Sequence, residues 1–371
     1  MASNEDIISA LRIINTHGIG SVKFYQLLDD FSTLNDVVSF LEKHSKQKPW
    51  SVEQAKKEIA KAQSLGVKII LYSDDEYPQS LRGDRNFSPL LYVKGDASLL
   101  NCEKSIAIVG GRAASVTGRK TAAKIAMELA ENNICVVSGM ARGIDTSAHK
   151  GAMYGLGQTG KTIAVLGTGI DIIYPPENKE VYEQIAQQGC IISEFLIGTK
   201  AVTSNFPRRN RIVAALSEGI LVVEASNNSG SLITAQYGID MKKVIFAVPG
   251  TPGESRTQGS NNLIKNGAIL VESASDILPF LKGNKIIEQP KLEQFIQKNL
   301  VFENNDDNYI EQKKSPETLQ DYLTVDGVHI DELIRLTGKS ASEIAMDIIE
   351  LELSGIAERR AGNKIALTGD K

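Results

Sequence analysis

Residues 105–112 read SIAIVGGR, and the rest of the chain can be interpreted from them. Residues 105–109 form a short apolar run rich in β-branched residues, which is typical of a buried parallel strand. Gly110, Gly111 and Arg112 follow at once, and helical spacing begins near Gly118. A glycine turn brings backbone close to a ligand, and the helix behind it offers amides and a positive dipole end. The pattern therefore predicts an anion-binding turn, although it is not a G-x-G-x-x-G fingerprint.

The same strand pattern recurs along the middle of the chain. Similar short apolar runs stand at 134–137, 163–166, 191–193, 220–223, 244–248 and 269–271, and helical patterns separate most of them. Repeated β–α alternation with apolar strands predicts an α/β domain whose mostly parallel sheet is covered on both faces. Ligands of such sheets bind outside the carboxyl ends of the strands, so the loops after these strands are the candidate site.

The region before this domain is predicted to be helical over residues 1–65. A Gly-x-Gly turn at 17–20 between two helical patterns resembles a helix-hairpin-helix, whose turn amides can bind a DNA phosphate. Because the segment has no basic excess, a plain helical bundle is the favoured interpretation. Residues 66–103 contain strand-like runs and are expected to pack on the main domain, which we place at 66–283.

The region after this domain divides into a linker and a third unit. Residues 284–315 are polar and charge-mixed, and they are predicted to be a linker around a short helix at 292–300. Residues 316–371 carry helical patterns at 317–323, 331–336 and 342–353, followed by a hairpin signal at Gly362 and Asn363. Three helices and a hairpin predict a winged helix.

Composition limits the class of protein. No early apolar run is long enough for a signal peptide or a membrane span, so we expect a soluble cytoplasmic protein. The three cysteines lack C-x-x-C spacing and the four histidines are scattered, so neither a zinc site nor another metal or cofactor is expected. Net charge is −4, yet residues 104–283 carry 18 basic and 14 acidic residues. Positive charge is therefore concentrated beside the glycine turns.

Three loops after strands carry the residues expected to bind anions. Ser138, Gly139 and Arg142 follow the second strand, where Asp145 is a predicted N-cap, and Asp145 with His149 suits a capped helix better than a metal pair. The run FPRRNR at 206–211 places three arginines beside an aromatic residue at a helix start, which suits a phosphate chain with a stacked base. Glu224 is followed by SGSLIT at 229–234, a possible phosphate cradle that lacks the G-K-[ST] of a Walker loop. The candidate DNA-binding residues are Gly111, Arg112, Ser138, Gly139, Arg142, Phe206, Arg208, Arg209, Asn210, Arg211, Ser229, Gly230, Ser231 and Thr234.

Several anion-binding loops at one sheet edge suit an extended polyanion better than one small nucleotide. No paired carboxylates, metal cluster or nucleophile–base pair can be placed among them, and neither Ser138 nor Ser231 stands in a G-x-S-x-G context. We therefore expect binding without catalysis, and no catalytic residue is predicted.

Taken together, these motifs resemble the DNA-processing protein A family, also called DprA or Smf. The resemblance covers the central domain through IAIVGGR at 106–112, SGMARGID at 138–145, FPRRNR at 206–211, SGSLIT at 229–234 and VPG at 248–250. It implies an extended Rossmann-like domain that binds single-stranded DNA in a basic pocket, forms a homodimer and helps load the RecA recombinase in natural transformation. It also implies that Arg112 and residues 209–211 hold the DNA backbone, that Phe206 stacks a base, and that residues 229–231 bind a phosphate.

Two departures from the family pattern, and one competing function, stand beside this resemblance. The first turn is Gly-Gly-Arg where Gly-Thr-Arg or Gly-Ser-Arg is usual, and Thr203 stands where some members have a lysine. Related lysine-decarboxylase-like proteins hydrolyse nucleoside monophosphates with a Pro-Gly-Gly-x-Gly-Thr loop followed by a glutamate. The corresponding SGSLIT here lacks that glutamate, which favours the binding protein over the hydrolase.

Overall fold

The structure is a computed structural model that describes residues 2–154, 161–281, 289–299, 319–323, 327–354, 356–360 and 362–368. The chain divides into two compact units, Met1–Phe302 and Glu303–Lys371. Residues 1–65, predicted as a domain of their own, belong to the same compact unit as the sheet. Within the described ranges, no helix is long and apolar enough to cross a membrane.

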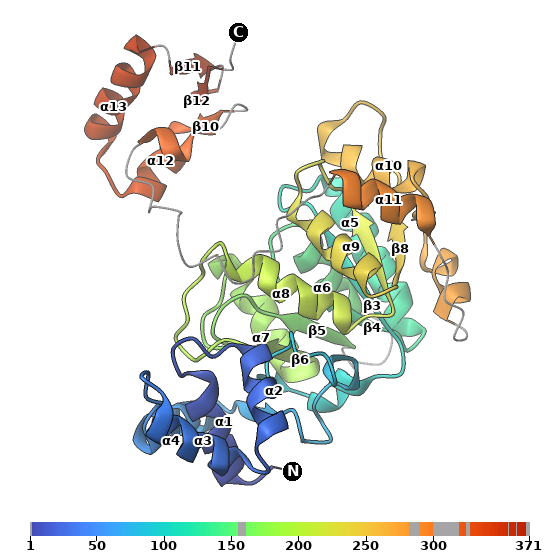
Figure 1. The fold of residues 1–371 in the computed structure, drawn as a ribbon. Helices are drawn as coiled ribbons and strands as arrows, with labels where there is room; N and C mark the ends of the chain where they lie inside the picture. The colour runs from blue at the N-terminus through green and yellow to red at the C-terminus, as the bar shows by residue number, and fades with distance from the viewer. Residues whose placement is uncertain are drawn as a thin grey trace. The chain divides into compact units, whose positions relative to one another are not determined.

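A nine-stranded sheet forms the centre of the first unit, in the order β1-β2-β6-β5-β4-β3-β7-β8-β9 (Figure 1). Every pairing from β6 through β9 is parallel, whereas β1 and β2 are antiparallel additions, so the mostly parallel sheet is confirmed. Residues 66–103 do more than pack on the domain, because they supply these two strands at one end of the sheet. The strands are β1 (Lys68–Leu71), β2 (Leu90–Gly95), β3 (Ser105–Gly110), β4 (Cys135–Ser138), β5 (Thr162–Val165), β6 (Cys190–Ser193), β7 (Gly219–Val223), β8 (Val244–Ala247) and β9 (Ile269–Leu270).

Helices cover both faces of this sheet, as the apolar strands require. Ile106 and Ile108 of β3 contact one core with α5 and α6, and Ala107 and Val109 contact the other core with α8 and α9. On the first face α5 and α6 approach closely, because a Cβ on Gly151 would lie 2.0 Å from the Ala123 carbonyl oxygen. The helices are α5 (Val116–Glu131), α6 (Ile144–Tyr154), α7 (Lys179–Gln188), α8 (Asn205–Ala215), α9 (Gly230–Asp240) and α10 (Gln258–Lys265). Short 3₁₀ turns are η1 (Gln79–Leu81), η2 (Ala97–Asn101), η3 (Pro176–Asn178), η4 (Ser255–Thr257), η5 (Ala274–Asp276) and η6 (Leu278–Leu281).

The strand order reverses between β3 and β7. The chain runs outward from β3 through β4, β5 and β6, then returns to place β7 against the other side of β3. Crevices form at such a switch point outside the carboxyl ends of the strands. The turn after β3 and the loop before α9 both open there, so two of the predicted anion loops come together.

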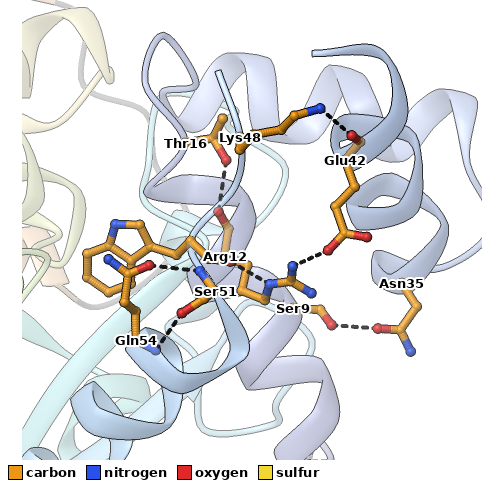
Figure 2. A network of polar contacts seen from close by, with 9 residues as sticks. Ser9, Arg12, Thr16, Asn35, Glu42, Lys48, Ser51 and Gln54 are labelled. Atoms are coloured by element: carbon orange, nitrogen blue, oxygen red, sulfur yellow. Dashed lines mark hydrogen bonds and ion pairs between the residues drawn. The ribbon is translucent and has the colours of Figure 1, made fainter. Parts of the chain in front are cut away.

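The amino-terminal helices are α1 (Asn4–Ile14), α2 (Ser21–Asp30), α3 (Leu34–His44) and α4 (Val52–Ser64), and they share a hydrophobic core with β1, β2 and α7. A polar network holds them together (Figure 2): Arg12 donates to the Trp50 carbonyl at 2.6 Å and pairs with Glu42. Glu58 of α4 is buried and accepts hydrogen bonds from the Tyr92 hydroxyl at 3.0 Å and the Ile197 amide at 2.8 Å. These bonds explain why the helices and the sheet form one unit.

The helix predicted for the linker belongs to the sheet unit instead. It is α11 (Pro290–Asn299), and Leu292 lies fully buried in the main core. Just before it, the buried Gln289 side chain accepts from the Ile245 amide at 2.9 Å and donates to the Ile245 carbonyl at 3.1 Å. The segment predicted as a linker from its polar composition therefore contains a buried apolar residue, Leu292, and a buried amide, Gln289, which join it to the main core.

The second unit has the predicted winged-helix elements. It contains α12 (Ile330–Thr337), α13 (Ala341–Leu353) and a three-stranded sheet in the order β10-β12-β11. Of the first predicted helix, 317–323, the described part holds a 3₁₀ turn, η7 (Leu319–Tyr322). The strands are β10 (Val328–His329), β11 (Ala357–Arg360) and β12 (Lys364–Leu367), with the predicted hairpin turn at Gly362 and Asn363.

Candidate nucleic-acid interface

A cleft of about 560 Å³ opens at the carboxyl ends of β3, β4 and β7. A smaller hollow of about 60 Å³ shares Arg112, Tyr174 and Phe206 with it. These three side chains therefore border both spaces. The predicted residues that line the larger cleft are Gly111, Arg112, Gly139, Phe206, Arg209, Asn210, Ser229, Gly230, Ser231 and Thr234.

Phe206 and Arg112 form the contact between the two hollows. The Arg112 guanidinium lies 5.5 Å from the centroid of the Phe206 ring, and the Tyr174 ring lies 5.5 Å from it on a tilted plane. Gly167 makes room for the ring, because a Cβ there would come within 2.8 Å of it. An exposed cation beside an aromatic face can hold a phosphate while the ring stacks a base.

The turn at the start of α9 lines the cleft through Ser229, Gly230 and Ser231. Ser229 is the N-cap, its hydroxyl lies 2.7 Å from that of Ser231, and Gly230 is exposed. The Asn210 amide donates to the Gly230 carbonyl at 3.3 Å and so joins α8 to this turn. Thr234 is buried one turn further on, at 1% exposure, and supports the helix. The amides of Ser229 and Ser231 already donate to the Ser226 carbonyl at 3.0 Å and to the Ser229 hydroxyl at 3.4 Å. The turn therefore offers an anion two hydroxyls, small residues and a positive helix end.

The loop after β4 is closed by a residue of the chain itself. The buried Asp145 carboxylate accepts hydrogen bonds from the amides of Gly139 at 3.1 Å and Ala141 at 3.3 Å. Asp145 is the second residue of α6 rather than the predicted N-cap. Ser138 is fully buried and donates to the Ile108 carbonyl at 2.6 Å, which corrects its assignment to DNA.

Arg209 supports the same loop from inside. Its side chain is 4% exposed and donates to the carbonyls of Gly139 and Val165. A Cβ on Gly139 would lie 2.5 Å from the guanidinium carbon, so that glycine is needed for this contact. Burial lowers the pKa of Arg209 to about 10, and burial raises the pKa of the neighbouring Asp145. The geometry gives Arg209 a supporting role, and because it also lines both hollows its contact with the DNA backbone stays a prediction.

Arg211 is turned away from the cleft lining. It pairs with Glu194, and their side chains are 11% and 4% exposed. Its guanidinium also lies 5.0 Å from the Phe87 ring centroid. This buried ion pair gives the third arginine of the motif a structural role, and its contact with DNA stays a prediction.

Two other predicted arginines, Arg142 and Arg208, are exposed. Arg142 lines the smaller hollow and pairs with Glu177, whose pKa is lowered by its own backbone amide and by Arg142. Arg208 is exposed, with its guanidinium 5.6 Å from the Phe195 ring centroid. Arg142 therefore borders the site, whereas Arg208 lines neither hollow.

His149 has a structural position. It is fully buried, and its Nδ1 lies 2.7 Å from the Thr162 hydroxyl. Burial lowers its pKa to about 3, so the ring is neutral. Among the described residues, no group of three His, Cys, Asp or Glu side chains could hold a metal.

Several residues of the cleft were missed by the sequence prediction. Arg256, Thr203 and Tyr174 line it, and Arg256 comes from the loop after β8. A lone arginine in a loop at the carboxyl edge of the sheet was the available signal for Arg256. Glu224 also lines the cleft, and its position directly after β7 was the available signal.

The family models agree with this geometry. Residues 68–282 match the model described as DNA recombination-mediator protein A, and residues 312–363 match the DprA winged helix domain. The chain belongs to the DprA/Smf family. The sequence resemblance is therefore confirmed, together with the mostly parallel sheet and the winged helix.

Individual relatives cover the chain widely. It is 30% identical to Protein Smf of Synechocystis over 93% of this chain and 86% of that protein. It is 42% identical to DNA processing protein DprA of Streptococcus pneumoniae over 55% of this chain and 71% of that protein. The X-ray structure of the pneumococcal protein matches with a TM-score of 0.63 and 32% identity, covering 75% of this chain and 98% of that one. A Helicobacter pylori DprA structure, described for its single-stranded DNA binding mode, matches with a TM-score of 0.52 and 30% identity over 58% of this chain and 95% of that one.

Proposed function

We propose that this DprA/Smf chain binds single-stranded DNA in the cleft at the β3–β7 switch point and acts in the cytoplasm as a recombination mediator. The observation that carries the proposal is the contact between Arg112 and Phe206 on the border of the two hollows. This contact places the Arg112 cation, which can bind a phosphate, beside the aromatic ring of Phe206, which can stack a base.

The arrangement favours a single strand over a duplex. Stacking on Phe206 needs an unpaired base, and a paired base cannot leave the helix without an unstacking cost. Contacts from arginines and backbone amides to phosphates carry no sequence code, so binding should depend little on sequence. The H. pylori relative, described for single-stranded DNA binding, supports the same ligand class.

The roles of the predicted residues divide into ligand contact and support. Arg112, Arg142 and Arg208 would bind phosphates, and Phe206 would stack a base. The turn at residues 229–231 would bind a further phosphate through its hydroxyls and the Gly230 amide. Ser138, Gly139, Arg209 and Asn210 would hold the walls in place, with Gly111 and Thr234.

The partners follow from family membership. We propose that the chain works as a homodimer, protects incoming single-stranded DNA and loads the RecA recombinase, as in natural transformation. The family model's description as a recombination mediator supports this role. We propose no catalytic role for the cleft, because the nearby Asp145 is buried and held by two backbone amides.

The test is a fluorescence anisotropy titration with a labelled oligo(dT) strand, a mixed-sequence strand and a blunt duplex at matched salt. Both single strands should bind at least tenfold tighter than the duplex. Phe206→Leu should lose about 1–3 kcal/mol of single-strand affinity. Phe40→Leu, which changes another partly exposed ring far along the sequence on α3, is the matched control. Equal affinity for strand and duplex would contradict the proposal.

A further inference from the structure

The amino-terminal end of α5 holds a carboxylate that belongs to the chain itself. The Glu224 carboxylate accepts a hydrogen bond from the Ser115 amide at 2.7 Å and another from the Ser115 hydroxyl. Ser115 is the N-cap of α5, and its hydroxyl accepts from the Gly118 amide at 2.9 Å. Glu224 therefore occupies the positive end of this helix, where free amides were expected from the sequence.

The surroundings are shaped to receive this side chain. A Cβ on Gly118 would lie 2.4 Å from the carboxyl carbon of Glu224, so the helix leaves out a side chain where the carboxylate sits. The Glu224 backbone is left-handed, with φ of 48°, which is uncommon for a residue with a side chain. Its carbonyl accepts from the Gly111 amide at 2.6 Å and so fixes this conformation. A strained backbone held by its neighbours is typical of a functional position.

The Glu224 carboxylate lies at the β3–α5 turn, beside the switch point of the sheet. Doubly wound sheets bind the pyrophosphate of nucleotides at the first strand-to-helix turn beside the switch point. Here that turn joins β3 to α5, and Glu224 fills it from the end of the neighbouring β7. Glu224 also lines the cleft, as do Ser229 and Gly230 at the start of α9. One of the two helix ends at the cleft is therefore occupied by an anion, and the other is open.

We propose that Glu224 acts as a resident anion that selects the phosphodiester backbone of DNA against pyrophosphate and free nucleotides. The inference rests on the proposed function and explains how the cleft distinguishes a polymer from abundant small phosphates. Electrostatic repulsion scales with charge. A phosphodiester carries one negative charge, whereas pyrophosphate and the phosphate chain of a nucleoside di- or triphosphate carry several negative charges on neighbouring phosphates. The fixed carboxylate therefore penalises the small ligands more, and it blocks the amides that would bind them.

A purely structural role for Glu224 makes a different prediction. If the carboxylate only caps α5, its neutralisation would change protein stability, and ligand affinities would shift together. Selection requires that the affinity ratio between pyrophosphate and single-stranded DNA changes. Glu224→Gln is the informative variant, because the amide keeps the size of the side chain and can still accept from the Ser115 amide.

The experiment measures how much sodium pyrophosphate displaces a labelled oligo(dT) from the full-length protein. For the wild type, pyrophosphate should displace the strand no better than sodium chloride of the same ionic strength. In Glu224→Gln, the ratio of pyrophosphate affinity to strand affinity should rise at least tenfold, so half-displacement should need far less pyrophosphate even if the strand itself binds more tightly. Glu131→Gln makes the same charge change at the exposed far end of α5 and should behave as the wild type.

Each outcome decides the inference. An unchanged ratio in Glu224→Gln, or the same shift in Glu131→Gln, would overturn it. If Glu224→Gln does not fold, the wild-type titration decides, because strong displacement by pyrophosphate itself contradicts selection. Calorimetry of pyrophosphate binding to each protein needs no DNA. It therefore tests Glu224 even if the strand does not bind, in which case the proposed function alone fails.

Discussion

The exposed arginines of the predicted anion-binding motifs differ from the buried ones. Arg112 and Arg208 are exposed and lie against aromatic rings. Arg209 and Arg211 are largely buried and satisfy carbonyls or a carboxylate of the protein. The comparison shows that a cluster of basic residues can hold a site's walls as well as its ligand.

The helical period explains the burial of Arg209 but not that of Arg211, which lies off the same stripe and is enclosed with Glu194 instead. The buried residues of α8 include Asn205, Arg209, Ile212 and Val213, which are spaced by three and four positions. Arg209 therefore lies on the stripe that faces the core, and its neighbour Arg208 lies outside it. A cation on that stripe needs acceptors inside the protein, and the loop carbonyls supply them.

Arg209→Ala is expected to have the largest effect and to break the wall of the cleft. It leaves two buried carbonyls without this donor and the buried Asp145 without its neighbouring positive charge. Removing one partner of buried charges costs about 3–5 kcal/mol, so we expect a loss of about 4 kcal/mol in the free energy of unfolding. Urea denaturation measures it. Arg208→Ala is the matched control and should stay within about 0.5 kcal/mol of the wild type; equal stability of the two variants would contradict the assignment.

Arg211→Ala should come next, with a loss of about 3 kcal/mol of stability, because it leaves Glu194 buried without its partner. The stability loss should be measured by urea denaturation, and the double variant with Glu194→Ala should lose less than the two single losses added together. At a temperature where the variant stays folded, its affinity for single-stranded DNA should be near that of the wild type. A folded Arg211→Ala protein that has lost its DNA affinity would restore Arg211 to the interface.

The sequence predicted the fold better than the site, for a physical reason. Runs such as residues 105–109 are apolar over their whole length because both faces of the sheet are covered. The strands, and the mostly parallel type of their sheet, can therefore be predicted from the sequence. The positions of β1, β2 and α11 in the fold were not predicted, because they depend on partners distant in sequence, such as Cys190 and Ile245.

Within the site, the sequence could identify which loops meet at the sheet edge but not what fills them. Arg112, Phe206 and residues 229–231 do line one cleft. Whether a loop's amides face solvent or an internal carboxylate depends on residues far away in sequence, as with Glu224 and Ser115. These contacts can be identified only in the folded structure, where strand pairing brings the two residues together.

Arg112→Ala tests an exposed arginine of the comparison. It should leave the stability of the protein unchanged and weaken the binding of single-stranded DNA. Losing one phosphate contact and the cation beside Phe206 should lower single-strand affinity about tenfold, or about 1.4 kcal/mol. The slope of log affinity against log salt should become shallower by about 0.7. Arg119→Ala removes an exposed arginine from α5 and is the control. An unchanged slope in Arg112→Ala, with stability also unchanged, would remove Arg112 from the interface.

The smallest effect is expected from deleting the winged helix, residues 316–371. A winged helix is commonly a duplex reader whose second motif helix enters the major groove and needs positive charge. Here that helix, α13, carries four acidic residues and no basic one. The arginines of the wing are also engaged, since Arg359 pairs with Glu352 at 3.1 Å and Arg360 with Glu358 at 3.0 Å.

We therefore propose that this unit binds protein rather than DNA. The apolar side chains of Met346 and Ile349 are 73% and 49% exposed on α13, among its acidic residues, which suits a protein surface better than a phosphate backbone. The truncated protein should keep its single-strand affinity within about threefold, less than 1 kcal/mol. Anisotropy titration of residues 1–315 against the full chain measures this, with circular dichroism and size-exclusion chromatography to establish that both are folded and in the same oligomeric state. A loss of tenfold or more under those conditions would give the winged helix a direct part in holding DNA, against the sign of its charge.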